Sequence, residues 1–386
     1  MNALFPDYRS TWETEEHGLL REHASTFFRK EATPHQERWA EQHEVDRDFW
    51  NKAGAAGLLC TDIPEEFGGG GGDFGHEATV WQEIAYAHDT AIAFSVHSTI
   101  CAHYIQAFAT DEQKRTWLPK LASGELVAAI AMTEPGTGSD LQAVRTTALR
   151  DGAHYVVNGS KTFITNGSHC DLVIVVAKTD PSLGSKGISL LVAETKDLPG
   201  FERGRVLHKI GANGMDTREL SFTDMRVPAA NLLGGVEGQG FYQLMKQLPR
   251  ERLIIGVGGL AMAEAALLET IAYVKDRRAF GKPILEFQNT KFVLAECKTE
   301  LLAGRTLMDY CIQRCIDGTL DAATASMAKL WGTDKQVEII DRCLQLFGGY
   351  GFVMEYPIAQ MYAAARVQKI YGGTNEIMKE LIGRTL

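Results

Sequence analysis

Residues 248–268, LPRERLIIGVGGLAMAEAALL, place one carboxylate between two arginines at the start of a long apolar stretch. Apolar residues continue at helical spacing, so we expect one long helix over residues 251–278. Glu251 would then lie where this helix begins. A glutamate there is either a solvated charge that favours the helix N-terminus or an acid–base group whose pKa is shifted by burial. The stretch by itself leaves both readings open.

Length and composition indicate a globular protein. The chain has 386 residues, of which 45% are hydrophobic and 23% charged, enough for two or three domains with a substantial core. A formal net charge of −10 argues against a nucleic-acid-binding protein, because phosphate binding requires a basic face. The apolar run at 253–263 is interrupted by glycines and ends at Glu264, so we expect no membrane span.

Targeting and metal signals are also missing from the sequence. The first residues are acidic, with no basic segment followed by an apolar one, so we expect neither a signal peptide nor a transit peptide. We therefore expect a cytoplasmic protein, or a protein of the mitochondrial matrix if a transit peptide has been removed. The seven cysteines form no CxxC pattern and are expected to be reduced. The eleven histidines show no HxH or HExxH spacing, so no metal site is expected.

The periodicity of the apolar residues changes twice, which predicts three domains of an α+β protein. Residues 1–126 form an N-terminal helical domain, 127–239 an antiparallel β domain and 240–386 a helical bundle of four long helices. Five glycines at 68–72 are interpreted as a flexible connector between helices, since no GK[ST] follows them. Within the β domain, Asn158-Gly159 predicts a type I′ turn between two strands of a hairpin.

Helix boundaries in the last domain follow from caps and breakers. After the helix over 251–278, we expect helices over 286–316, 319–346 and 357–370, and a last one from Glu376 capped by Thr374 or Asn375. The segment GVGGLA at 256–261 fits a degenerate dinucleotide-binding fingerprint. That fingerprint requires a preceding strand, whereas here helical pattern runs on both sides, so close helix packing is the better explanation.

Two kinds of loop carry candidate chemistry. The segment IAMTEPGTGSD at 130–140 leaves backbone N–H groups and the hydroxyls of Thr133 and Ser139 uncovered, which suits an electron-rich heterocycle or a phosphate; a plain tight turn is the alternative. Segments 277–288, 345–352 and 371–376 each place glycine, glutamine, arginine or an aromatic residue at a helix end. Three such ends in one bundle indicate a large phosphate-bearing cofactor.

These motifs together resemble the acyl-CoA dehydrogenase family, and most closely its long-chain branch. The resemblance rests on AMTEPGTGSD (131–140), KTFITNG (161–167), DRRAFGKPILEFQ (276–288), QLFGGYGF (345–352) and KIYGGTNEIMKELI (369–382). It implies FAD and α,β-desaturation of an acyl-CoA thioester to the trans-2-enoyl-CoA, with electrons passed to an electron-transfer flavoprotein. It also implies a homotetramer that shares each flavin across a subunit boundary, and medium-to-long or branched acyl chains. An oxidase-like flavoenzyme and a non-enzymatic binder on the same scaffold are the alternatives.

The resemblance also implies site residues. Flavin contacts would be made near the ring by Ile130, Met132, Thr133, Gly138, Ser139, Phe163, Ile164 and Thr165, and on the C-terminal loop by Thr374 and Glu376. Pyrophosphate and adenosine contacts, partly from the neighbouring subunit, would be made by Arg277, Phe280, Gln288, Gln345, Gly348 and Gly349. Substrate contacts would be made by Ser139, Ser185, Lys186, Tyr242, Pro249, Arg250, Arg252 and Gly372.

Two positions depart from the commoner family pattern. Phe163 stands where many members carry a flavin-stacking tryptophan, and it keeps an aromatic face. Most members read Tyr-Glu-Gly-Thr on the C-terminal loop, and that glutamate is the catalytic base; this chain has Gly372 there, which cannot take a proton. The long-chain and isovaleryl branches place the base where this chain has Glu251. We therefore expect Glu251 to be the base, with Glu134 structural and Glu376 a flavin contact.

Overall fold

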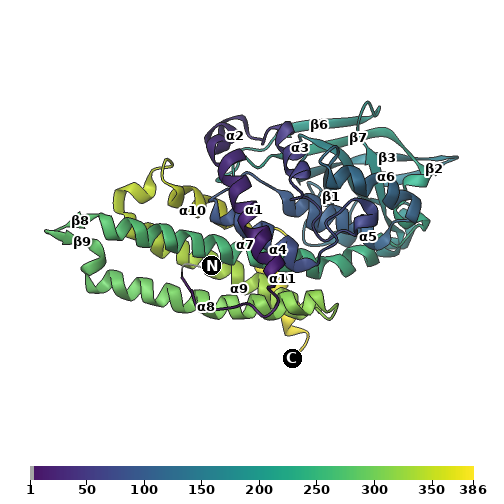
Figure 1. Cartoon of the computed structure of the whole chain (residues 1–386). Helices are drawn as coiled ribbons and strands as arrows, with labels where there is room; N and C mark the ends of the chain where they lie inside the picture. The colour runs from purple at the N-terminus through teal and green to yellow at the C-terminus, as the bar shows by residue number, and fades with distance from the viewer. Residues whose placement is uncertain (1–3) are drawn as a thin grey trace.

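Two helical domains flank a β domain, in the order that the periodicity of the sequence predicts (Figure 1). The computed structural model describes residues 4–386. Its N-terminal helices are α1 (Glu15–Glu31), α2 (Gln36–Gln42), α3 (Arg47–Ala55), α4 (Phe74–Tyr86), the π-helix η3 (Ser95–Ala102), α5 (His103–Phe108) and α6 (Asp111–Ala122).

The apolar run from Ala78 to Phe108 does not form one continuous helix. It breaks after α4, where His88 has a positive φ of 56° and the Asp89 carboxylate accepts hydrogen bonds from the backbone N–H groups of Ala91 and Ile92. An aspartate that binds its own following backbone competes with helix continuation. The π-helix then begins beyond the break, and π-helical turns are frequently found at functional sites.

The glycine-rich connector lies between a short 3₁₀ helix, η2 (Glu65–Phe67), and α4, as expected. It is held in place, which differs from the expected flexibility. Gly70 donates its N–H to the carbonyl of Cys60, and Gly72 donates to that of Thr61. A Cβ at Gly69 would lie 2.2 Å from the Ile63 carbonyl oxygen, so the glycines allow two backbone segments to approach closely.

The β domain is a mixed sheet, which corrects the expectation of a purely antiparallel one. Strand β1 runs parallel to β4, and β2 also pairs with β4 in parallel at one residue. A parallel neighbour requires a long connection, and here β2 and β3 lie in the chain between β1 and β4. The strands are β1 (Val127–Ala131), β2 (Thr147–Asp151), β3 (His154–Thr165), β4 (Cys170–Lys178), β5 (Ile188–Glu194), β6 (Phe201–Val206) and β7 (Thr217–Pro228).

The hairpin turn predicted at Asn158-Gly159 is wrong. Strand β3 continues through both residues, and the β2–β3 hairpin turns instead at Gly152, where φ is 59°. Gly159 has a different role: its Cβ would lie 2.4 Å from the hydroxyl oxygen of Thr146. The β3–β7 register shifts at this point, so Gly159 marks a bulge and a close approach rather than a turn.

The C-terminal domain is a bundle whose helices agree closely with expectation except at one end. The helices are α7 (Gly240–Asp276), α8 (Gln288–Ile316), α9 (Ala322–Phe347), α10 (Pro357–Gln368) and α11 (Asn375–Gly383). Thr374 caps α11 through its hydroxyl, as expected. Helix α7, however, begins at Gly240 rather than Glu251 and contains Pro249 in its interior. Glu251 is therefore well inside the helix, and its interpretation as an N-terminal charge is wrong.

Glycines in α7 allow close packing of helices, as predicted for the GVGGLA segment. A Cβ at Gly256 would lie 2.7 Å from the Ala328 carbonyl oxygen of α9, and one at Gly332 would lie 2.6 Å from the Gly256 oxygen. Among residues 4–386, α7 is the one helix long and apolar enough to span a bilayer by length and composition. Its apolar window is 78% buried by the surrounding domains, which is the pattern of a core helix.

Candidate active site

A cavity with a volume of ≈ 440 Å³ lies where all three domains meet. The N-terminal domain contributes η3, the β domain contributes the 130–142 loop and the end of β3, and the C-terminal domain contributes α7 and residues 371–384. Helix α7 contributes a stripe at helical spacing: Phe241, Met245, Leu248, Glu251, Arg252, Ile254 and Ile255. This volume and mixed lining are those of a small-molecule site.

Glu251 is the buried carboxylate of this cavity. It is 5% exposed, and burial raises its pKa to about 7. Its Oε1 accepts a hydrogen bond of 2.8 Å from the hydroxyl of Tyr104, a fully buried residue of α5. A carboxyl group with a pKa near neutrality is suited to proton transfer at physiological pH.

Two other carboxylates line the cavity, but both are exposed. Asp140 accepts a hydrogen bond from the backbone N–H of Gln142 and caps a short helix, η4 (Leu141–Ala143). Glu380 of α11 pairs with Arg384 across one helical turn, at 3.0 Å. Glu251 is therefore the one buried carboxylate among the described residues that line this cavity.

The loop opposite Glu251 is shaped by two consecutive glycines. Gly372 has a φ of 64° and Gly373 a φ of 91°, a region that L side chains rarely adopt. A Cβ at Gly372 would also lie 2.4 Å from Cδ1 of Ile255. A glutamate at position 372 would therefore be strained, which agrees with the base lying elsewhere.

This loop is held by two buried cations. Arg252 donates from Nε to the Gly372 oxygen over 3.5 Å, and Lys329 donates from Nζ to the Gly373 oxygen over 2.8 Å. Lys329 also donates to Oδ1 of Asn375, the first residue of α11, over 2.8 Å. Burial lowers the pKa of Lys329 to about 8. Sequence analysis did not identify Lys329, because no local motif surrounds it.

Residues expected near the flavin ring gather on one side of the cavity. The set that lines it comprises Ile130, Met132, Thr133, Gly138, Ser139, Phe163, Ile164 and Thr165. Phe163 has a positive φ of 60°, and the β3–β7 register shifts beside it, so its ring is 66% exposed. Strained backbone of this kind clusters at functional sites.

The loop that carries these residues is supported by a buried ion pair. Glu134 receives a 2.9 Å hydrogen bond from Lys161 Nζ and accepts from the backbone N–H groups of Arg145 and Thr146. Lys161 also donates to the carbonyls of Met132 and Val176. The structure therefore shows Glu134 as a structural residue, as expected from the sequence.

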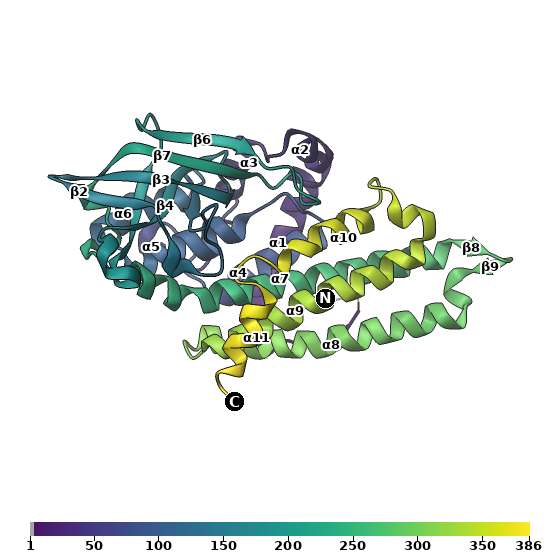
Figure 2. The same ribbon diagram turned by 180° about the vertical axis from the view of Figure 1, so that it is seen from behind.

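Residues expected at the pyrophosphate and adenosine lie in a second, open cavity of ≈ 670 Å³. It contains Arg277, Phe280, Gln345, Gly348 and Gly349, while Gln288 lies beside it as the exposed first residue of α8. Its short ribbon, β8 (Arg278–Ala279) and β9 (Lys282–Pro283), lies at the end of the bundle far from the β domain (Figure 2). Within one chain the two cavities are therefore separate.

Several expected contacts lie outside both cavities. Ser185 and Lys186 lie on η5 (Pro181–Gly187), which touches η4 at the rim of the first cavity. Tyr242 of α7 is 55% exposed, and Glu376 of α11 is also exposed. Of the expected substrate contacts, the structure brings Ser139, Arg252 and Gly372 to the cavity. The lining does not include Ser185, Lys186, Tyr242, Pro249, Arg250, Thr374 or Glu376.

Arg250 points away from the cavity into a buried polar cluster. It forms an ion pair with Asp62, donates from Nε to the Thr99 carbonyl over 3.3 Å and lies over the ring of Phe74. Successive residues of an α-helix are turned by about 100°, so Arg250 and Arg252 lie on nearly opposite faces. The structure therefore brings Arg252, and not Arg250, to the lining of this cavity.

Comparison with known proteins identifies the family of this chain. The acyl-CoA dehydrogenase family models match residues 14–125 (N-terminal domain), 129–225 (middle domain) and 238–386 (C-terminal domain). A mitochondrial long-chain specific acyl-CoA dehydrogenase of Sus scrofa is 48% identical over 375 residues, 97% of this chain and 87% of that protein.

Solved structures show the same fold over nearly the whole length. An acyl-CoA dehydrogenase from Geobacillus kaustophilus has a TM-score of 0.95 and 45% identity, covering 98% of this chain and 99% of that one. A glutaryl-CoA dehydrogenase from Mycobacterium smegmatis, in complex with FADH2, has a TM-score of 0.92 and 28% identity, covering 100% and 97%. The chain therefore belongs to the acyl-CoA dehydrogenase family of enzymes.

Proposed function

We propose that this enzyme desaturates a medium-to-long or branched acyl-CoA at Cα–Cβ, with Glu251 as the base that removes the Cα proton. The observation that carries the proposal is the burial of Glu251 in the cavity with a pKa of about 7. An ordinary exposed glutamate is too weak a base to remove a proton from carbon effectively, whereas a desolvated one is better matched.

The residues around the cavity fit the family's cofactor, FAD. Thr133, Ser139 and Thr165 line the cavity, and their hydroxyl groups make no hydrogen bond within residues 4–386. Phe163 offers an exposed aromatic face. These residues would hold the flavin ring. When bound, FAD would accept the hydride that leaves Cβ of the substrate.

The C-terminal loop that contains Gly372 would contact the substrate thioester rather than hold the flavin. Gly372 has a backbone N–H that finds no acceptor within residues 4–386, and the loop is held by Arg252 and Lys329. We assign this N–H to the thioester oxygen, where negative charge grows as the Cα proton leaves. A fixed donor at that position stabilises the transition state more than the ground state.

The second cavity supports an oligomeric enzyme. Arg277, Phe280, Gln345, Gly348 and Gly349 line it, yet it lies away from the residues proposed for the flavin ring (Figure 2). One dinucleotide can use both sets only if they come from different chains. This supports a homo-oligomer with FAD sites shared between chains, which we propose to be a tetramer. From the family resemblance alone we also propose an electron-transfer flavoprotein as electron acceptor and a location in the cytoplasm or the mitochondrial matrix.

The test is Glu251→Gln, compared with Glu269→Gln on the same helix. We expect the rate at which acyl-CoA reduces the bound flavin to fall at least about 100-fold in Glu251→Gln, the scale of a lost general base. The visible absorbance of the flavin should remain, which shows that the fold and cofactor site are intact. Near-normal flavin reduction by Glu251→Gln would refute the assignment of the base.

A further inference from the structure

The active-site cavity and a smaller cavity of ≈ 40 Å³ follow one another along helix α7. The residues of α7 that line the first cavity end at Ile254 and Ile255, and those that line the second are Gly258 and Met262. These positions continue one face of the helix, because residues three or four apart lie above one another. The two cavities are therefore neighbours, and three residues line both: Trp81, Met215 and Tyr371.

Trp81 of α4 lies between the two cavities at the point where α7 has a glycine. A Cβ at Gly258 would lie 2.1 Å from Nε1 of Trp81, so the indole ring occupies the space that a side chain would need there. Gly258 follows Glu251 by about two helical turns, which corresponds to about 10.5 Å along the axis. The indole therefore bounds the active-site cavity about 10 Å beyond the proposed base.

An acyl chain bound in this cavity would run from Glu251 towards Trp81. Tyr242, an expected substrate contact, precedes Glu251 on α7 and is 55% exposed, so the large polar CoA portion would leave the cavity on that side. On the other side of Glu251, the face of α7 that lines the cavity carries the apolar side chains of Ile254 and Ile255. This lining suits a hydrocarbon chain that extends as far as the indole.

The smaller cavity behind the indole has a partly polar lining. Nε1 of Trp81 and Oε1 of Gln336 are buried and make no hydrogen bond within residues 4–386. Asp89, Thr90 and Gln368 also line this cavity. A polar cavity of this size suits an ordered water, which needs at least about 10–15 Å³ and about two to four polar partners. The methyl end of an alkyl chain would leave these polar groups without partners, so the chain should stop at the indole.

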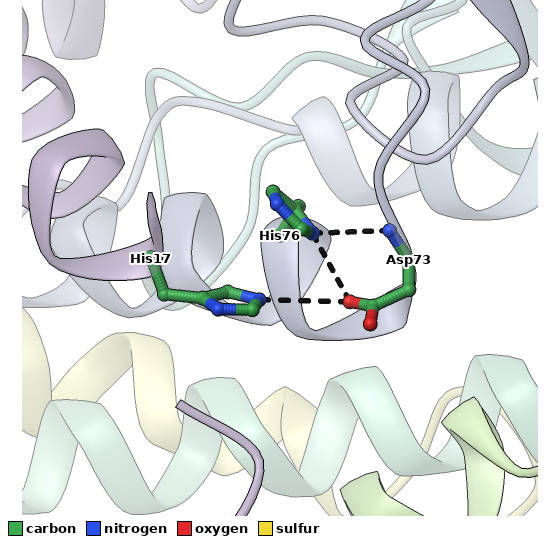
Figure 3. Close-up of side chains that lie close together, drawn as sticks. All are labelled: His17, Asp73 and His76. Carbon is green, nitrogen blue, oxygen red and sulfur yellow. Dashed lines mark hydrogen bonds and ion pairs between the residues drawn. The ribbon is translucent and has the colours of Figure 1, made fainter. Parts of the chain in front are cut away.

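Helix α4, which carries Trp81, is fixed at its start (Figure 3). The backbone N–H of Asp73 donates to Nδ1 of His76 over 3.0 Å, and Nε2 of His17 lies 3.6 Å from Oδ1 of Asp73. Nδ1 of His17 likewise accepts the backbone N–H of Thr14, so both neutral rings carry their proton on Nε2, and the three side chains serve as helix caps. This cap and the packing of α4 against α7 hold the indole in place.

We infer that Trp81 is a specificity-determining residue, which ends the acyl pocket and sets the longest straight chain that the enzyme uses efficiently. The inference rests on the proposed desaturation of acyl-CoA, but not on the identity of the base. Each additional buried methylene group increases affinity about fourfold. Efficiency should therefore rise with chain length until the methyl end meets the indole, and fall for longer chains.

The test measures flavin reduction by a series of saturated, straight-chain acyl-CoAs of increasing length. We compare wild type with Trp81→Leu and Trp81→Ala, which shorten the side chain over Gly258. Trp331→Leu is the matched control, because Trp331 of α9 lines neither cavity. Anaerobic rapid mixing gives the rate constant and the apparent affinity for each chain length, and the flavin absorbance shows that the fold and the cofactor site are intact.

We expect the preferred chain in Trp81→Ala to be longer than in wild type by at least about two methylene groups, which corresponds to a gain of about 15-fold in apparent affinity for that chain. Trp81→Leu should lie between the two, and Trp331→Leu should match wild type. In wild-type crystals soaked anaerobically with the longest efficient substrate, the methyl end should lie within about 4.5 Å of the indole. This measurement does not depend on the folding of any variant.

Two results would overturn the inference: an unchanged dependence on chain length in both flavin-loaded Trp81 variants, or a chain that ends away from the indole in the wild-type crystals. Either result leaves the desaturation of acyl-CoA intact. If no acyl-CoA reduces the flavin of wild type, the proposed function itself is refuted, and the role of Trp81 with it.

Discussion

Replacing Tyr104 with phenylalanine should weaken Glu251 as a base at neutral pH by raising its pKa. The Tyr104 hydroxyl donates to Glu251 over 2.8 Å, and this contact lowers the pKa of the carboxyl against the larger effect of burial. A hydrogen bond to a charged group contributes about 1.5–3 kcal/mol, and about 1.4 kcal/mol corresponds to one pKa unit. The pKa of Glu251 should therefore move from about 7 to about 8 or 9.

The direction of the change in rate follows from the protonation state of Glu251 that reacts. Only the ionised carboxylate can accept the Cα proton, and at pH 7 its fraction should fall from about one half to about one tenth or one hundredth. Flavin reduction by acyl-CoA at pH 7 should thus slow about 5- to 50-fold and recover as the pH rises towards about 10. Anaerobic rapid mixing, monitored by flavin absorbance across this pH range, measures the shift directly.

A matched substitution separates this effect from general damage. Tyr155 is also fully buried and donates to a glutamate, Glu237, over 2.5 Å, but it does not line the active-site cavity. Tyr155→Phe should leave the pH profile of flavin reduction unchanged. If the profile of Tyr104→Phe stays in place or moves towards acid, the hydrogen bond does not stabilise the ionised form of Glu251, and the reasoning fails.

Four further predictions concern stability. Because the pKa of Glu251 is raised in the folded state, wild type loses the stabilising contribution of the protonated form as the pH rises towards about 7. In urea unfolding, the free energy of unfolding of Glu251→Gln should therefore rise by about 3 kcal/mol relative to wild type between about pH 4.5 and pH 8. Lys329→Met should leave the Gly373 oxygen unpaired and cost about 1–3 kcal/mol, with faster flavin loss on dilution. Gly256→Ala should destabilise by about 1–3 kcal/mol because of its clash with α9. Gly18→Ala, with nothing within 4 Å, should stabilise α1 by about 0.5–1 kcal/mol in the same assay.

The order of helical and β domains could be predicted because apolar periodicity is a local property of the chain. The turn at Asn158-Gly159 could not, because Gly159 is required by a neighbour, Thr146, which directly precedes β2. The parallel pairing of β1 with β4 is likewise a contact between distant segments. Local turn chemistry and local periodicity carry no information about such approaches.

Residues of the candidate site divide in the same way, into those that local sequence indicates and those that depend on contacts between distant segments. Loops with unusual local composition pointed to Ser139 and Gly372, the family resemblance pointed to Phe163, and all three line the cavity. Tyr104 and Lys329 were missed because each acts through hydrogen bonds to residues far away in sequence. Arg250 and Arg252 were both expected at the substrate. Their spacing on one helix places them on nearly opposite faces, and of the two only Arg252 lines the cavity.

The proposed position of the base on α7 and the shape of the loop at residues 372–373 depend on one another. Glu251 and Ile255 lie one turn apart on α7, so both side chains cover the same face of the helix. Ile255 occupies the space that a Cβ at Gly372 would need, and the positive φ of Gly372 disfavours any side chain there. With the base on α7, the loop at residues 372–373 needs to contribute only its backbone, and Lys329 holds that backbone in place. The carboxylate on α7 has a rigid support and accepts a hydrogen bond from the buried hydroxyl of Tyr104.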